Sequence, residues 1–338
     1  MKAAGWMKAA TAAALCGLLL LGGCSPEQGG TKVRLAEVAR TIFYAPQYVA
    51  LSQGFFAEEG LDVELTTIPG GDKSMTALLS NQADIALIGS ETSIYIVQQG
   101  TQDPVINFAQ LTQTDGTFLF ARSTEGEFDW ESLKGSEFLG QRKGGMPQMA
   151  GEFALRKHYI DPHQDMQLIQ NIDFANITSA FASGTGDYVQ LFEPQASIFE
   201  KEGRGHVVAS FGTESGLLPY TVYMAKQSYL QQHGETAQKF ANALQKAQQW
   251  VKEHSPEEIA AAILPYFKDT DKDIVISSIK RYKEQGTYAE NPVIDDKEWA
   301  NLLNVMDSAG ELQREVPLEE IVNNQFAEKA AGSLEESD

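Results

Sequence analysis

The residues best able to contact a small ligand lie in six short loops, each near the carboxyl end of an expected strand. These loops combine glycine with hydroxyl, amide, carboxylate and aromatic side chains. They cover residues 41–47, 70–72, 89–92, 111–113, 144–147 and 192–194. Four of them adjoin the start of an expected helix, where free backbone N–H groups can hydrogen-bond a ligand. Each loop alone is a weak signal, but six at one edge predict a site for a small molecule.

From these loops and one adjoining strand we predict a set of ligand-binding residues. Glu193 is the strongest candidate, although a solvated glutamate before a proline is the alternative. Asp72 could instead cap a helix, and Tyr44 could simply be a packing residue. The full set is Tyr44, Pro46, Gln47, Gly71, Asp72, Ser90, Glu91, Thr92, Thr112, Gly145, Met146, Tyr188 and Glu193.

The chemistry of these side chains favours one ligand class over another. Aromatic faces can stack on a flat ring, and a carboxylate can pair with the N–H edge of an aminopyrimidine. The loops therefore favour a nitrogen-rich heteroaromatic ligand, neutral or cationic. Lys73, Arg142 and Lys143 are the evidence against this, because a sulfonate or nitrate ion needs such cationic donors.

Expected strands and helices alternate along the chain, which indicates an α/β fold with mostly parallel, doubly wound sheets. The strands are expected at 33–38, 61–68, 84–88, 105–111, 118–121, 137–140, 187–191, 206–209 and 220–224. Beyond residue 224 the pattern is helical. There, Ser255-Pro256-Glu257-Glu258 has the form of a capping box with proline at the first helical position.

The simplest arrangement of these elements is two lobes joined by two crossings of the chain, near Thr117 and near Pro219. Two crossings make a hinge with a cleft, where small ligands bind. We expect a signal peptide at 1–23, a flexible tether at 24–31 and a frayed tail at 332–338. Lobe one would comprise 32–116 and 220–331, and lobe two 117–219.

Composition excludes several functional classes. The 338 residues are 43% hydrophobic, as in globular proteins, and the net charge of −20 opposes binding to nucleic acid. Both cysteines lie within the first 24 residues, so the body has no cysteine nucleophile and no cysteine-ligated metal. The five histidines lack metal-ligand spacing. We therefore expect no metal, no cofactor and no catalytic residue.

The N-terminus has the pattern of an export signal. Lys2 and Lys8 precede an apolar run from residue 9 to 21, which is too short to span a membrane. The run ends in Leu21-Gly22-Gly23-Cys24, which resembles the lipoprotein box of bacteria. The resemblance implies cleavage before Cys24, lipidation of its thiol and attachment to the outside of the cell membrane. An uncleaved anchor and an ordinary signal peptide are the alternatives.

Two blocks of sequence resemble the substrate-binding proteins for sulfonate, nitrate, taurine and thiamine-pyrimidine uptake. The first runs from Tyr44-Ala45-Pro46-Gln47 through Gly54-Phe55-Phe56 to Gly89, and the second is the pair Glu193-Pro194. The resemblance covers about residues 33–225. It implies a two-lobed periplasmic-binding-protein type II fold with extra C-terminal helices on lobe one. It also implies delivery of ligand to an ABC permease.

Two other functional classes compete with a transport binding protein. A eukaryotic thiamine-pyrimidine synthase shares the fold but carries a cysteine-rich iron motif, which is absent after Cys24. A sensor or adhesin could use the same cleft for signalling. We expect a monomeric, non-enzymatic binding protein whose partners are a small molecule, a permease and, through lipid, the membrane.

Overall fold

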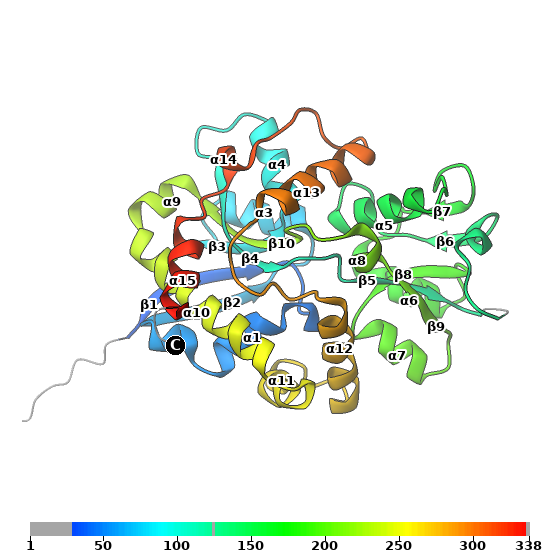
Figure 1. Ribbon diagram of the computed structural model, residues 1–338, viewed down its shortest axis with the longest axis horizontal. Coiled ribbons are helices and arrows are strands. Elements are labelled where there is room, and N and C mark those ends of the chain that lie inside the picture. The colour runs from blue at the N-terminus through cyan, green and yellow to red at the C-terminus, as the bar shows by residue number, and fades with distance from the viewer. Residues whose placement is uncertain (1–28, 124–125, 336–338) are drawn as a thin grey trace, which may run out of the picture.

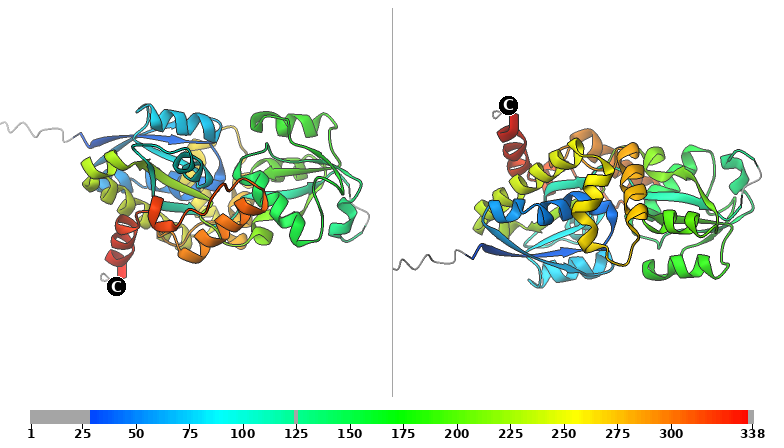
Figure 2. Two further views of the ribbon diagram at one scale, coloured as in Figure 1. Left: turned by 90° about the horizontal axis from the view of Figure 1, so that it is seen from above. Right: turned by 90° about the horizontal axis from the view of Figure 1, so that it is seen from below.

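The computed structural model describes residues 29–123 and 126–335 and consists of two lobes, each with one five-stranded sheet covered by helices (Figure 1). Figure 2 shows the lobes side by side along the long axis, seen from above and from below. The predicted signal peptide and Cys24 lie outside the described residues. Within 29–123 and 126–335, no helix combines the length and the apolar character that a membrane crossing requires.

The sheet of lobe one has the order β2-β1-β3-β10-β4. Strands β3 and β4 are buried along their whole length, because helices cover both faces of the sheet. β1 begins at Thr31, inside the predicted tether. The strands are β1 (Thr31–Glu37), β2 (Leu61–Thr67), β3 (Ile85–Gly89), β4 (Val105–Thr112) and β10 (Thr221–Lys226).

The sheet of lobe two has the order β7-β6-β8-β5-β9. Apolar clusters lie around it: Phe138 and Phe211 belong to one, and Phe120 and Phe181 belong to the other. The short edge strand β7 was not predicted from the sequence. The strands are β5 (Thr117–Ala121), β6 (Glu137–Leu139), β7 (Gln167–Ile169), β8 (Tyr188–Phe192) and β9 (His206–Ser210).

The prediction of mostly parallel sheets needs one correction, because both sheets are mixed. In lobe one, β1 runs parallel to β2 and β3, but β10 runs antiparallel to β3 and β4. In lobe two, β6 runs parallel to β7 and β8, whereas β5 is antiparallel to β8 and β9. The reason is connectivity: β5 and β10 are the strands by which the chain enters lobe two and returns to lobe one.

Helices surround both sheets, and the longest described one, α10, packs against α1, α2 and α15. Those of lobe one are α1 (Ala45–Ser52), α2 (Phe55–Glu58), α3 (Gly71–Leu79), α4 (Glu91–Gln98), α9 (Gln227–Gln232), α10 (Gly234–Glu253), α11 (Pro256–Ile263), α12 (Lys272–Gln285), α13 (Asp296–Ser308), α14 (Leu318–Ile321) and α15 (Gln325–Glu335). Those of lobe two are α5 (Met146–Lys157), α6 (Ile177–Ala182), α7 (Gln195–Lys201) and α8 (Phe211–Ser215). Single 3-10 turns are η1 (Ile42–Tyr44), η2 (Trp130–Leu133), η3 (Phe174–Asn176) and η4 (Leu264–Tyr266).

Two predictions from the sequence concern the C-terminal helices. The capping box is confirmed, since Ser255 and Glu258 exchange hydrogen bonds at the start of α11. The prediction of a frayed tail from residue 332 is wrong as far as residue 335, because α15 continues that far. Phe326 and Ala330 anchor this helix, as both are buried against the core of lobe one.

The first crossing between the lobes is tightly packed. A Cβ on Gly116 would lie 2.5 Å from the ring of Phe43, so only glycine allows this ring to reach the crossing. The adjacent Asp115 is buried and accepts a hydrogen bond from the backbone N–H of Thr117 at 2.6 Å. Burial raises the pKa of Asp115 to about 6. This crossing therefore contains a desolvated carboxyl group.

Candidate functional site

A cavity of about 400 Å³ lies between the two lobes, within the range that small-molecule sites occupy. Lobe one contributes residues 70–72 and most residues of 38–44 and 88–95 to the lining. Lobe two contributes residues 141–147 and the turn before α6. These segments follow β1, β2, β3 and β6, at the carboxyl ends of parallel strands. The predicted location of the site therefore agrees with the position of this cavity.

The antiparallel strand β10 adds residues that the sequence analysis missed. In the register of the sheet, Thr221 at the amino end of β10 lies opposite Gly89 at the carboxyl end of β3. Tyr220 and Thr221 consequently line the cavity. A returning antiparallel strand presents its amino end at the ligand edge, so an expectation of mixed sheets would have identified both residues.

Aromatic rings form much of the cavity wall. Phe43 is at the centre of the group, with ring centroids of Tyr44, Phe192 and Tyr220 between 5.4 and 5.6 Å away. Phe174 contacts Phe192 from lobe two at 5.9 Å. Both lobes thus contribute aromatic side chains to the lining of the cavity.

Glu91 provides a carboxylate inside the cavity. It is the first residue of α4 and is only 5% exposed. Its Oε1 accepts a hydrogen bond from the backbone N–H of Met146 at 3.2 Å, which links lobe one to lobe two. Burial raises the pKa of Glu91 to about 7, and the N–H groups of Glu91 and Met146 oppose that rise. A neighbouring contact from the Tyr95 hydroxyl to the carbonyl of Gly144 at 3.2 Å also joins the lobes.

The cationic side chains lie at the exposed mouth of the cavity. Arg142 is 56% exposed and lies 3.8 Å from Asp72 of lobe one and 3.9 Å from Asp173 of lobe two. Arg40 pairs with buried Glu37 at 3.5 Å. Lys143 also lines the cavity. Positive charge is therefore solvated and largely paired with carboxylates, whereas the interior carries Glu91.

Seven of the predicted site residues line the cavity together. They come from η1, from the starts of α3 and α4, and from the start of α5 in the other lobe. Asp72 lies in the first turn of α3, where the N-cap residue is Gly70. The seven are Tyr44, Gly71, Asp72, Glu91, Thr92, Gly145 and Met146.

Five predicted residues lie outside the lining because they hold the structure behind it. Pro46 is buried in α1, and Gln47 donates to Glu37 at 2.8 Å. Ser90 is buried at the start of α4, and Thr112 hydrogen-bonds Thr221 across β4 and β10. The hydroxyl of Tyr188 contacts Ser132 at 3.1 Å within lobe two. The positions of these five do not support direct contact with a ligand.

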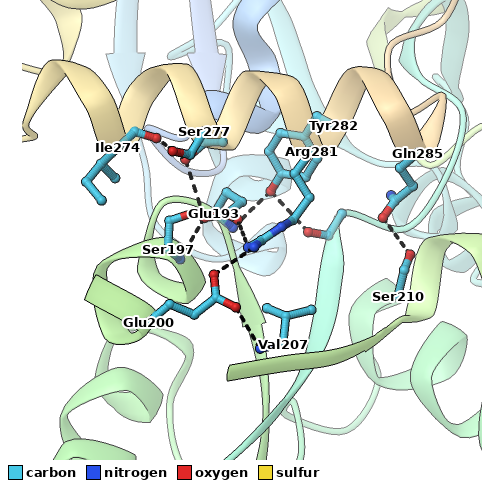
Figure 3. A network of polar contacts seen from close by, with 12 residues as sticks. Glu193, Ser197, Glu200, Val207, Ser210, Ile274, Ser277, Arg281, Tyr282 and Gln285 are labelled. Atoms are coloured by element: carbon cyan, nitrogen blue, oxygen red, sulfur yellow. Dashed lines mark hydrogen bonds and ion pairs between the residues drawn. The ribbon is translucent and has the colours of Figure 1, made fainter. Parts of the chain in front are cut away.

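Glu193, the strongest candidate from the sequence, also lies outside the cavity lining. It is fully buried and paired with Arg281 of α12, as Figure 3 shows. Its carboxylate accepts hydrogen bonds from the backbone N–H and the hydroxyl of Ser197 at 3.0 and 2.9 Å. Arg281 also reaches Glu200 at 2.7 Å. Glu193 therefore connects α12 to lobe two. The prediction that it contacts a ligand is not supported, and its role is structural.

Several lining residues gave no signal in the sequence. Phe174, Ile177 and Thr178 come from η3 and α6, which were not predicted, and Gln195 begins the unpredicted α7. The described residues contain no group of three or more histidine, cysteine, aspartate or glutamate side chains placed to hold a metal.

The sequence matches the NMT1-like family model over residues 27–265. A protein named "Putative binding protein YtlA" from Bacillus subtilis is 62% identical over 312 residues, which cover 92% of this chain and 93% of that protein. The expectation of a binding protein rather than an enzyme agrees with this name.

Solved structures share the two-lobed fold. A ligand-binding component of an ABC-type import system from Staphylococcus aureus, with zinc bound, has a TM-score of 0.73 at 16% identity and covers 89% of this chain and 99% of its own. The alkanesulfonate-binding protein SsuA from Xanthomonas axonopodis pv. citri, bound to MOPS, has a TM-score of 0.70 at 15% identity. The match covers 87% of this chain and 98% of SsuA. The predicted periplasmic-binding-protein type II fold is confirmed.

Proposed function

This chain belongs to the NMT1-like family and is a solute-binding protein, and we propose that it serves an ABC importer by capturing a nitrogen heteroaromatic molecule. A thiamine-pyrimidine precursor is the favoured ligand. We infer the ligand class from the wall of the cavity. Its aromatic residues surround a space of about 400 Å³; they are Phe43, Tyr44, Phe174, Phe192 and Tyr220. Such rings stack on a flat ligand and exclude water from it.

Capture would proceed by closure of the lobes without covalent chemistry. The cavity has residues of both lobes in its wall, so a ligand that contacts both stabilises the closed state. The shift toward closure equals the difference in ligand affinity between the two states. The closed form then presents a surface to the permease that the open form lacks.

Seven residues are proposed as ligand contacts, all of them in the cavity lining. Tyr44 supplies an aromatic face, and Thr92 and Asp72 supply polar atoms. Gly71 and Gly145 let backbone approach the ligand closely, and Glu91 and Met146 lie where the lobes meet.

A sulfonate, taurine or nitrate ligand is the second candidate. The observation in its favour is the pair Arg142 and Lys143 at the mouth of the cavity. The solved relative SsuA binds an alkanesulfonate, as its name states. Against this, Arg142 lies close to both Asp72 and Asp173.

A thermal-shift screen of pyrimidines, aliphatic sulfonates, taurine, nitrate and riboflavin-like compounds tests the proposal. We expect stabilisation by the pyrimidines, because ligand that binds only the folded state raises the unfolding temperature. Calorimetry then measures the affinity of each hit. Hits confined to the anions would refute the heteroaromatic assignment.

Lipid attachment at Cys24 is part of the proposed function as well. A tethered binding protein stays near its permease, which raises the local concentration of captured ligand. A permease partner and a sensor partner would share this requirement. Co-purification of the chain with transmembrane subunits of a permease from detergent-solubilised membranes distinguishes the two.

A further inference from the structure

Two helix N-termini from different lobes meet at the inner part of the cavity. Glu91 is the first residue of α4 in lobe one, and Met146 is the first residue of α5 in lobe two. Each N-terminus carries a partial positive charge and free N–H groups, which together stabilise an anion. A pair of facing N-termini would by itself favour a negatively charged ligand group.

The position between these termini is already filled by the protein's own side chain. The Glu91 carboxylate accepts the Met146 N–H at 3.2 Å and interacts favourably with its own backbone N–H. Pro147, the next residue of α5, has no N–H to offer. The Met146 N–H at the start of α5 is therefore engaged by Glu91.

The backbone beneath the carboxylate is shaped to receive it. A Cβ on Gly89 would lie 2.1 Å from Glu91 Oε2 and 2.8 Å from its carboxyl carbon, so only glycine leaves room for this side-chain position. Oε2 is buried and has no hydrogen-bond partner among the described residues. An unpaired buried oxygen is costly, so the fold accepts a penalty to keep the carboxylate here.

We infer that the Glu91 carboxylate is a built-in anion, which occupies the anion-accepting end of the cavity and excludes sulfonate, nitrate and similar ligands. The inference rests on the proposed function, since it concerns the same cavity and decides between the two proposed ligand classes. An anionic ligand would have to displace Glu91 or lie beside it, and like charges repel strongly in a desolvated site. A neutral or cationic ligand meets no such barrier.

Substitutions at Glu91 separate this role from a purely structural one. Glu91→Ser and Glu91→Ala remove the carboxylate and open the space between the two N-termini. Glu91→Gln keeps an oxygen that can accept from Met146, so the space stays filled. Glu58→Ser removes one negative charge at an exposed position of α2, where the side chain is 57% exposed, without opening the cavity.

Methanesulfonate binding to the purified full chain, measured by isothermal titration calorimetry at pH 7.5, is the test. We expect Glu91→Ser and Glu91→Ala to bind methanesulfonate at least about tenfold more tightly than wild type, since charge-assisted hydrogen bonds become available. Glu58→Ser should bind it no better than wild type. Glu91→Gln removes the repulsion but keeps the space filled, so its gain should be smaller than that of Glu91→Ser. Circular dichroism and unfolding temperature establish that each variant is folded.

Two results would overturn the inference. One is binding of methanesulfonate to wild type with a Kd of about 1 μM or tighter, and this measurement needs no variant to fold. The other is a folded Glu91→Ser or Glu91→Ala with no gain. Failure of the proposed function would give a different result. The heteroaromatic compounds would then fail to bind wild type, regardless of whether Glu91→Ser and Glu91→Ala bind methanesulfonate.

Discussion

Replacing Glu91 with glutamine should change how the stability of the protein depends on pH. The pKa of Glu91 rises from 4.5 to about 7 on folding because the side chain is buried. Between these two values the folded state holds a proton that the unfolded state has released. Stability of the wild type therefore falls as pH rises through this window, and the glutamine variant lacks this contribution.

The magnitude follows from the pKa difference. A rise from 4.5 to about 7 at 1.36 kcal/mol for each pKa unit corresponds to about 3 kcal/mol. The free energy of unfolding of Glu91→Gln, relative to wild type, should increase by that amount between pH 4.5 and pH 8. A constant offset from altered packing does not affect this change, since it is the same at every pH.

Urea unfolding at half-unit pH steps, followed by circular dichroism, provides the measurement. Asp115 and Glu298, whose pKa values rise to about 6 and about 7, are present in both proteins and cancel in the difference. Thr92→Ser is the matched control on the same helical turn, because it adds and removes no titratable group. Its difference from wild type should be constant across the pH range.

A flat difference between Glu91→Gln and wild type would refute the reasoning. It would mean that Glu91 titrates alike in the folded and unfolded states, and hence that burial does not outweigh the two backbone N–H groups that stabilise the charge. The free energy of unfolding of Glu91→Gln relative to wild type could instead fall as pH rises. That result would show that folding lowers the pKa of Glu91, because the two helix N-termini stabilise its ionised form.

Three further predictions address other parts of the chain. Arg281→Ala should lower the free energy of unfolding by about 3 kcal/mol, because it leaves the buried carboxylate of Glu193 without its cation; a urea titration that shows less than about 1 kcal/mol would contradict the pairing. Gly89→Ala should lower the unfolding temperature, since its Cβ collides with the Glu91 carboxylate, and the double variant with Glu91→Ser should recover most of the loss; equal losses in single and double variants would disprove the contact. Cys24→Ser should abolish incorporation of labelled palmitate in a bacterial host and release the protein from the membrane fraction; labelling of the variant at the wild-type level would exclude this cysteine as the attachment point.

The loops that line the cavity could be predicted because they follow directly from strand order. A strand that ends in Gly-Ser-Glu or Pro-Gly-Gly before a helix places those residues at the carboxyl edge of the sheet. This local rule placed Asp72 and Glu91 near one another, although they are 19 residues apart. It could not say which of the polar side chains turn inward.

The interpretation of Glu193 shows the limit of that rule. Glutamate at the end of a buried strand satisfies the same local pattern as Glu91, yet it turns away from the cavity toward Arg281. Its partner comes from α12, 88 residues later in the chain. Nothing in the local sequence reveals that a C-terminal helix of lobe one packs against α7 of lobe two.

The sequence by itself determined the alternation of strands and helices, the two-lobed fold and the family, because these depend on periodicity, turn residues and motifs within short segments. Only the tertiary structure decided that the Glu91 side chain reaches the cavity and that Glu193 forms a buried ion pair instead. The physical reason is that the environment of a carboxylate is set by what packs against it. Glu91 lies under the N-terminus of a helix from the other lobe, and Glu193 lies under an arginine from a distant helix.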